Sequence, residues 1–173
     1  KDARSENTHK YVLKAIRCND SDDIKMLKDE TITGTGPSVE KWGTRIYCHC
    51  VYNTRTKNIQ RIKNSSGPGL IGLYIMQHVM TGVTSGGSKN QQFATLDKFI
   101  NRIIPNQKLG VKSKKATLLD LQSKIQKTLR SFYRVPRIHG DLHDQNIMVV
   151  FSIRNKLLKV MRVTIIDYGA TYT

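Results

Sequence analysis

The chain has 173 residues, of which 38% are hydrophobic, which suits one ordinary domain or two small lobes and argues against global disorder. Its formal charge of +16 favours polyanionic partners such as nucleotides, nucleic acid, acidic proteins or anionic membrane surfaces, without choosing among them. No run approaches the ~18 apolar residues of a membrane span, and the polar N-terminus lacks a signal-peptide core. We therefore expect a soluble intracellular protein of the cytoplasm or nucleus, and the missing initiator Met suggests that the sequence is an excerpt or has been processed.

The first half of the sequence predicts a small sheet with one helix. Residues 11–16 are rich in β-branched and aromatic side chains and predict a strand, which Lys14 interrupts. Acidic residues and N-cap candidates over 19–23 precede a short helix that should end by Gly34. Two further strands are expected at 45–52 and 72–80.

A Gly- and Ser-rich connector divides the sequence. It covers residues 81–90 and is the expected boundary between a first lobe, residues 1–80, and a second lobe, residues 81–173. One cooperative globular unit remains the default for a chain of this length.

The second lobe opens with two predicted helices. A short helix over 96–104 should end at Pro105, and a basic loop should follow it from 106 to 115. In the longer helix, which Pro136 should end, apolar residues recur at spacings of three and four and leave an opposite face rich in Lys. This apolar stripe consists of Leu118, Leu121, Ile125, Leu129 and Phe132.

Positive charge is concentrated between Arg102 and Arg137. This segment, residues 102–137, has ten Lys and Arg residues against Asp120 alone. Two interpretations stay open, a solvated basic face and a face that docks a polyanion such as nucleic acid or an acidic protein.

The stretch RIHGDLHDQNIMVV, residues 137–150, crowds polar residues ahead of a predicted hairpin. The two strands of the hairpin, within 147–166, return the chain to its starting point, so Asp167 should lie beside Asn146 with Asp141 near. Carboxylate and carboxamide oxygens suit Mg²⁺, which keeps ligand positions for phosphate oxygens. The same residue types also form turns, so spacing alone leaves a purely structural loop as the alternative.

The motif HGDLHDQN at 139–146, followed by IIDYG, resembles the catalytic and metal-binding motifs of the protein-kinase-like superfamily. In that pattern an Asp is followed five residues later by an Asn, as Asp141 is by Asn146. The HGD form is most similar to atypical branches such as the aminoglycoside and choline phosphotransferases and the RIO kinases. The resemblance implies an α+β, bilobal protein-kinase-like fold, with a small antiparallel N-terminal sheet lobe carrying one helix. The C-terminal lobe would be mainly helical, with a catalytic-loop hairpin and a metal motif at 167–169.

The resemblance also implies parts that bind a nucleotide. Lys14 in YVLKAI would neutralise nucleotide phosphates, and Glu30 on the short helix would pair with it. The strand YIMQHVMTG is similar to the hinge of this family, where backbone groups bind adenine. Here those groups would belong to Gln77, His78 and Val79.

By resemblance, the activity would be in-line transfer of the γ-phosphoryl group of ATP to a hydroxyl acceptor. Asp141 would orient the acceptor and take its proton, while Asn146 and Asp167 would hold Mg²⁺. His139 would fix the loop, and Tyr168 would pack under the metal-binding Asp. The short span between hinge and catalytic loop favours a Ser/Thr protein acceptor over a small molecule.

Three features depart from the family pattern. The thirteen residues ahead of Lys14 contain no Gly, so the Gly-rich loop that covers phosphates is missing from this stretch. The chain stops just after the metal motif, so we expect truncation at both ends. Gly140 stands where regulated protein kinases carry an Arg. A catalytically weak kinase-like module that binds nucleic acid or an acidic protein is therefore the alternative. A minimal basic kinase of this type would suit a large DNA virus and could be associated with its virion.

Overall fold

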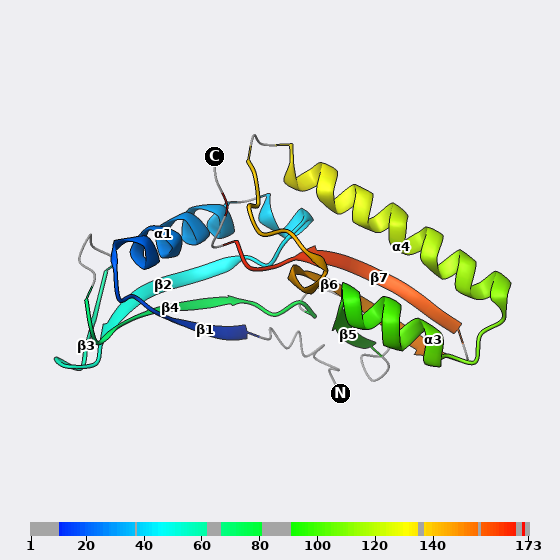
Figure 1. Ribbon diagram of the computed structural model, residues 1–173, viewed down its shortest axis with the longest axis horizontal. Helices are drawn as coiled ribbons and strands as arrows, with labels where there is room; N and C mark the ends of the chain where they lie inside the picture. The colour runs from blue at the N-terminus through cyan, green and yellow to red at the C-terminus, as the bar shows by residue number, and fades with distance from the viewer. Residues whose placement is uncertain are drawn as a thin grey trace, which may run out of the picture.

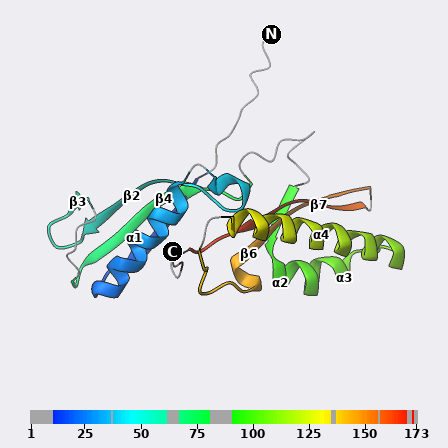
Figure 2. The same ribbon diagram turned by 90° about the horizontal axis from the view of Figure 1, so that it is seen from above.

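The computed structural model describes residues 11–36, 38–61, 67–80, 91–134, 137–155, 157–168 and 171. These residues form an α+β arrangement of two antiparallel sheets, one of four strands and one of three. The sheets lie end to end along the long axis of the molecule, with helix α1 on the first and helix α4 on the second (Figure 1, Figure 2). The predicted connector over 81–90, Pro136 and Gly169 lie outside the described residues.

The first sheet has the strand order β1-β4-β2-β3, in which every neighbouring pair is antiparallel. The strands predicted from the sequence at its centre are present, and the short β3 strand was not predicted. The strands are β1 (Tyr11–Arg17), β2 (Ile46–Asn53), β3 (Asn58–Gln60) and β4 (Leu70–Gln77).

Helix α1 (Ser21–Thr35) begins where the sequence predicts. The Asp20 carboxylate accepts hydrogen bonds from the backbone of Asp22 and Asp23, and the Asp23 side chain binds back to the N-cap backbone, which forms a capping box. The helix buries Ile24 and Leu27 against the first sheet. Leu27 also lies against Gly72 of β4, where an added Cβ would come within 2.5 Å of a Leu27 methyl carbon. The capping box therefore sets the start of α1, and the small Gly72 lets the helix approach the sheet.

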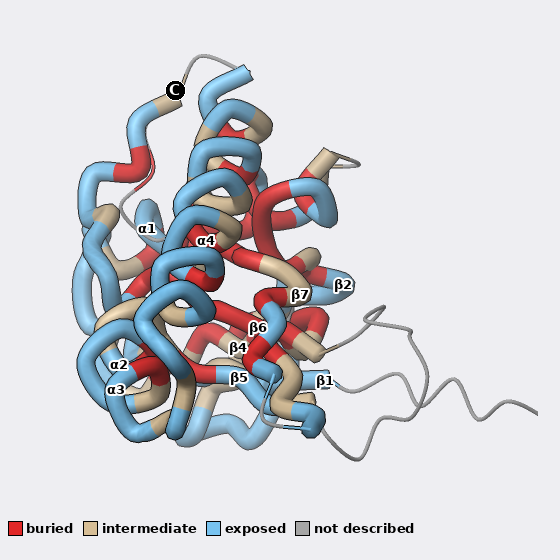
Figure 3. Tube along the Cα trace, turned by 90° about the vertical axis from the view of Figure 1, so that its right-hand side faces the viewer, coloured by how far each residue is buried: buried red, intermediate tan, exposed pale blue. Residues whose placement is uncertain are grey.

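The second sheet has the order β5-β6-β7, and the predicted hairpin supplies β6 and β7. Helix α4 (Val111–Phe132) crosses β7 and buries Leu121 and Phe132. Two hydroxyls on this inner face, those of Thr117 and Thr128, donate hydrogen bonds to carbonyl oxygens of β7. Buried positions gather along β6 and β7, whereas the outward side of α4 is mostly exposed (Figure 3). The strands are β5 (Gln91–Thr95), β6 (Ile147–Arg154) and β7 (Leu157–Ile165).

A buried aromatic cluster joins the two halves. The segment after α1 contains a 3₁₀ turn, Val39–Lys41, followed by Trp42 and Gly43. Gly43 forms a parallel β-bridge with Ile165, and the Ile165 amide donates to the Trp42 carbonyl oxygen at 2.7 Å. The Trp42 ring packs edge-on against Phe132 and Tyr168. This junction fixes the end of β7 relative to the segment that follows α1.

Two predictions for the second half are wrong. Pro105 does not end the short helix. A π-helical segment, Phe99–Ile103, leads from α2 (Leu96–Lys98) into α3 (Ile104–Asn106). Pro105 lies in the first turn of α3, where a proline is tolerated. The basic loop expected to reach residue 115 is shorter, because α4 begins at Val111. The strand β5 was not predicted.

None of the helices in the described part of the chain combines the length and apolar character needed to cross a bilayer.

Candidate active site

Lys14 lies at the centre of a charged group built from three distant segments. Its Nζ atom is 2.8 Å from Glu30 Oε1 and 2.8 Å from Asp167 Oδ1. Lys14 comes from β1, Glu30 from α1, and Asp167 from the chain just after β7. The structure therefore brings together the predicted phosphate-binding Lys, its predicted Glu partner and the predicted metal-binding Asp.

Glu30 is held by a second partner that the sequence analysis missed. The Tyr74 hydroxyl donates to Glu30 Oε2 at 2.8 Å, so each carboxylate oxygen has a partner, and the Glu30 side chain is only 1% exposed. Burial and the Glu30 carboxylate hold the pKa of Tyr74 far above its usual value, so this phenol stays a donor. Burial lowers the pKa of Lys14, but Glu30 and Asp167 outweigh it and leave that pKa raised. The ammonium is therefore charged at neutral pH.

The choice of Glu30 among the acids of α1 follows from the helical repeat. Ile24, Leu27 and Glu30 are spaced by three residues and are all buried, so they share the face turned to the sheet. Asp22 and Asp23 lie in the first turn, where Asp23 takes part in the cap. Glu30 is thus the acid of α1 that the helical repeat turns toward β1.

The loop between α4 and β6 is organised around Asn146. Its Nδ2 atom donates to the Asp141 carbonyl oxygen at 2.9 Å, to Asp141 Oδ2 at 3.3 Å, and lies 3.1 Å from His143 Nε2. Both Asp141 atoms only accept, which identifies the nitrogen end of this carboxamide. Its oxygen end is therefore the one that could serve as a metal ligand. The Asp141 side chain itself is 62% exposed.

His139 is buried, and its Nε2 atom lies 3.3 Å from the Ile166 carbonyl oxygen. The imidazole also packs against Phe132. This environment suits a residue that holds the loop against the end of β7, which is the role expected for His139.

The hairpin returns the chain to Asn146. The Ile166 amide donates to the Asn146 carbonyl oxygen at 2.9 Å, and Asp167 is the next residue. Asp167 has a φ of 61°, a left-handed conformation that is uncommon outside glycine and often found where side-chain placement matters. The expected convergence of Asn146 and Asp167 is thus present in the backbone.

Buried contacts of Tyr168 fix the backbone next to Asp167. Tyr168 is fully buried, its hydroxyl donates to the Ile165 carbonyl oxygen at 2.9 Å, and the Thr44 amide donates to that hydroxyl. Burial raises the pKa of Tyr168 well above its usual value. The hydroxyl thus ties the residue after Asp167 to the junction at Gly43 and Thr44, and the sequence analysis did not anticipate this contact.

A cavity of about 340 Å³ lies beside the charged group, between the two sheets. Its volume is within the range of small-molecule sites. Its walls combine mostly apolar side chains from both sheets with Lys14, Glu30 and Asp167. The apolar walls include Val12, Met76, Val79, Phe93, Met148 and Ile166.

The predicted hinge residues Gln77, His78 and Val79 also line this cavity. Two of their backbone groups are already engaged. The Gln77 amide donates to the Arg45 carbonyl oxygen at 2.7 Å, and the Val79 carbonyl oxygen accepts from the Arg162 guanidinium. The sequence analysis missed this contact of Arg162, because Arg162 and Val79 are far apart in the sequence and meet only in the folded chain.

The oxygen donors of Asp167 and Asn146 suit Mg²⁺ better than a metal that needs three or more protein side chains. Among the described residues, no group of three or more His, Cys, Asp or Glu side chains is placed to hold a metal ion. Mg²⁺ needs no such group, since one carboxylate, one carboxamide oxygen and phosphate oxygens satisfy it. Asp167 offers such a carboxylate and Asn146 such a carboxamide.

Comparison with known proteins adds no further assignment. No protein-family model matches the chain, and no curated protein matches it.

Proposed function

We propose that this chain is an ATP-dependent phosphotransferase that transfers the γ-phosphoryl group to a hydroxyl acceptor, with a protein Ser or Thr favoured. The observation that carries the proposal is the contact of Lys14 with both Glu30 and Asp167 at the edge of a cavity of about 340 Å³. A cation shared by a structural acid and a metal-binding acid is suited to receive phosphate oxygens.

The architecture proposed with this function is a bilobal kinase-like fold. The four-stranded sheet with α1 would be the first lobe, within residues 1–80, and the three-stranded sheet with α4 the second, within 81–173. The cavity between the sheets would hold the nucleotide. Its apolar walls suit a base, and Lys14 suits the phosphates.

The residues would divide the chemistry among them. Bound Mg²⁺ would supply charge neutralisation on the phosphates, with Asn146 and Asp167 as its protein ligands. Lys14 would bind phosphate oxygens while Glu30 holds its ammonium in place. The Asp141 carboxylate would orient the acceptor hydroxyl and accept its proton, and its 62% exposure leaves it accessible to an acceptor.

The decisive experiment measures transfer of γ-labelled phosphate from ATP with Mg²⁺ to acidic, basic and hydroxyl-bearing protein and small-molecule acceptors. Asp141→Asn should reduce transfer by about 10²- to 10⁴-fold, the usual contribution of a positioned acid or base. Asp144→Asn is the matched control, because it lies in the same loop and its side chain is similarly exposed, 56% against 62%. The control should retain most activity.

Two results would refute the proposal. One is the absence of transfer by the unaltered protein to every acceptor class, although ATP binds. The other is an equal effect of Asp141→Asn and Asp144→Asn. The first result would favour the alternative, a catalytically weak module of the same fold.

A further inference from the structure

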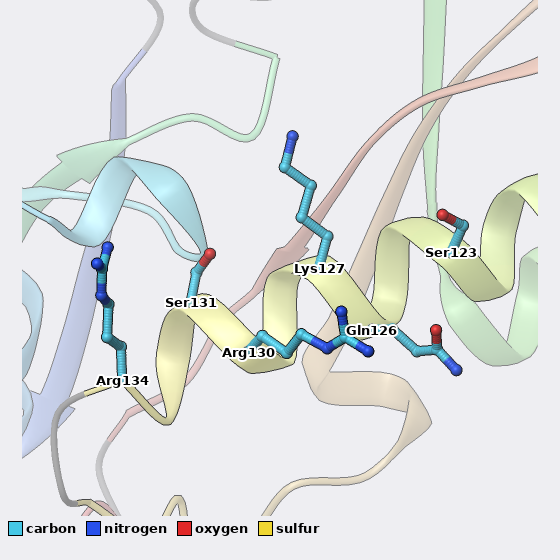
Figure 4. Close-up of a pocket in the computed structure, with 6 residues that line it drawn as sticks. All are labelled: Ser123, Gln126, Lys127, Arg130, Ser131 and Arg134. Atoms are coloured by element: carbon cyan, nitrogen blue, oxygen red, sulfur yellow. The ribbon is translucent and has the colours of Figure 1, made fainter.

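The outward face of α4 carries a shallow basic hollow of about 500 Å³. Its lining is polar and charged, whereas the cavity between the sheets is lined mostly by apolar side chains. The described lining residues of the hollow come from α4 and, in the case of Arg134, from the turn that follows the helix (Figure 4). Three lining residues are cations, and the other three offer hydroxyl or carboxamide groups. The lining consists of Lys127, Arg130, Arg134, Ser123, Gln126 and Ser131.

The helix exposes this face because its opposite face is buried. Thr128 and Phe132 pack toward β7, and residues about half a turn away, such as Lys127 and Arg130, are exposed. None of the described residues lines both this hollow and the cavity that contains Lys14. It is therefore a separate surface.

The cations of the hollow have no acidic partner among the described residues. The ion pairs formed by this part of the chain do not include Lys127, Arg130 or Arg134, and the one acid of α4, Asp120, pairs with Lys124 instead. Lys127 and Arg130 lie three residues apart on α4, a spacing that makes their like charges neighbours on the helix surface. An anionic ligand would relieve that repulsion.

The basic face is longer than the hollow. Lys112 and Lys115 are also exposed on α4, and from Lys112 to Arg130 the helix rises about 27 Å at about 1.5 Å per residue. Guanidinium and ammonium groups bind phosphate oxygens, and hydroxyl and carboxamide groups such as those of Ser123 and Gln126 add neutral donors. This length suits a chain of phosphates better than a single phosphate group.

An aromatic residue at the end of the helix distinguishes between polyanions. Tyr133 follows the cationic turn and is 49% exposed. Exposed aromatic rings beside Arg and Lys are the usual platform on which unpaired bases stack. A membrane surface would instead favour apolar side chains among the cations, and the described residues that line the hollow are all polar or charged.

We propose that the outward face of α4 binds single-stranded nucleic acid, with Lys127, Arg130 and Arg134 on the phosphates and Tyr133 under a base. The proposal does not depend on the proposed phosphotransfer. Binding at this face and turnover at Asp141 are measured by different assays on the same protein.

The test is fluorescence anisotropy with a labelled oligothymidylate of about 20 nucleotides between about 50 and 200 mM salt. The variant Lys127→Gln/Arg130→Gln/Arg134→Gln keeps good helix formers on the surface of α4. It should bind at least about tenfold more weakly, and the slope of log K against log salt should become shallower by about 2, from about 0.7 for each of three phosphate contacts.

A charge-matched control separates this face from the general positive field. Lys25→Gln/Arg55→Gln/Arg154→Gln also removes one Lys and two Arg from exposed positions, none of which belongs to α4. It should weaken binding by less than about threefold and leave most of the salt slope. Circular dichroism should show both variants folded. Equal losses in the two variants would overturn the proposal.

Two further arms identify the ligand class. Tyr133→Ser should weaken oligothymidylate binding about fivefold or more, and Tyr133→Phe should restore it, because either aromatic ring can stack. If Tyr133→Ser has no effect and inorganic polyphosphate competes as well as the oligonucleotide, the assignment to nucleic acid is wrong. It is also wrong if the α4 variant loses binding only to vesicles of phosphatidylserine and phosphatidylcholine.

Discussion

Replacing Lys14 by Met tests how the charged group at the candidate active site is held together. The change leaves the Glu30 carboxylate, which is 1% exposed, with the Tyr74 hydroxyl as its remaining partner. Removing one member of a fully buried ion pair costs about 3–5 kcal/mol. The loss should be smaller here, because Lys14 is 28% exposed and the Tyr74 hydroxyl still donates to Glu30. We therefore expect the free energy of unfolding to fall by about 2–3 kcal/mol.

The second step of this prediction is a partial recovery. Glu30→Gln in the Lys14→Met background removes the buried charge but keeps an acceptor for the Tyr74 hydroxyl. The double variant should therefore be more stable than Lys14→Met alone by about 1–2 kcal/mol. Glu30→Gln in the unaltered chain should still be destabilising, because it weakens the contact with Lys14.

Urea unfolding suits this experiment because urea adds no ionic screening, and the single tryptophan, Trp42, reports from the buried junction. Lys124→Met and Asp120→Asn form the matched control pair, since they remove a surface ion pair spaced four residues apart on α4. The control changes should stay within about 0.5 kcal/mol. Additive losses for Lys14→Met and Glu30→Gln would refute the idea that Lys14 neutralises a buried carboxylate.

Two further predictions concern the junction and its tyrosines. Gly43→Ala should lower the free energy of unfolding by about 1–3 kcal/mol in urea, because the new methyl group would overlap the Tyr168 hydroxyl; an unchanged midpoint would contradict this packing. Burial holds the pKa of Tyr74 and of Tyr168 above the ordinary value, so above about pH 10 the unfolded chain loses protons that the folded chain keeps. The free energy of unfolding should then fall by up to about 1.4 kcal/mol per pH unit for each tyrosine, and Tyr168→Phe should flatten this pH dependence.

The sequence predicts the local elements well where caps and periodicity agree. Asp20 and Asp23 mark the start of α1, and the apolar repeat that includes Leu27 also places Glu30 on the buried face. The hairpin predicts that Asp167 returns to Asn146, and the Ile166 amide makes that contact. These features depend on neighbouring residues, which is why pattern and spacing suffice.

Features that depend on distant segments were missed. The start of α4 has no side-chain cap, since Gly110 occupies the N-cap position, and the first turn is supported by the contact of Lys114 with the Pro105 carbonyl oxygen. Tyr74 shows an ordinary strand pattern, and only the packing of α1 on β4 reveals its bond to Glu30. A residue pattern contains no signal for such pairings.

Two independent sets of contacts determine where the Asp167 carboxylate lies. In the first set, Lys14 Nζ lies 2.8 Å from the carboxylate. In the second set, the Tyr168 hydroxyl accepts from the Thr44 amide and donates to the Ile165 carbonyl oxygen, which fixes the residue after Asp167. The first set belongs to the sheet that carries β1, and the second to the junction that joins both sheets. The position of a metal-binding acid would therefore depend on how the two sheets meet. A substitution at Gly43 should then reduce phosphotransfer more than its effect on stability accounts for, although Gly43 touches no proposed ligand.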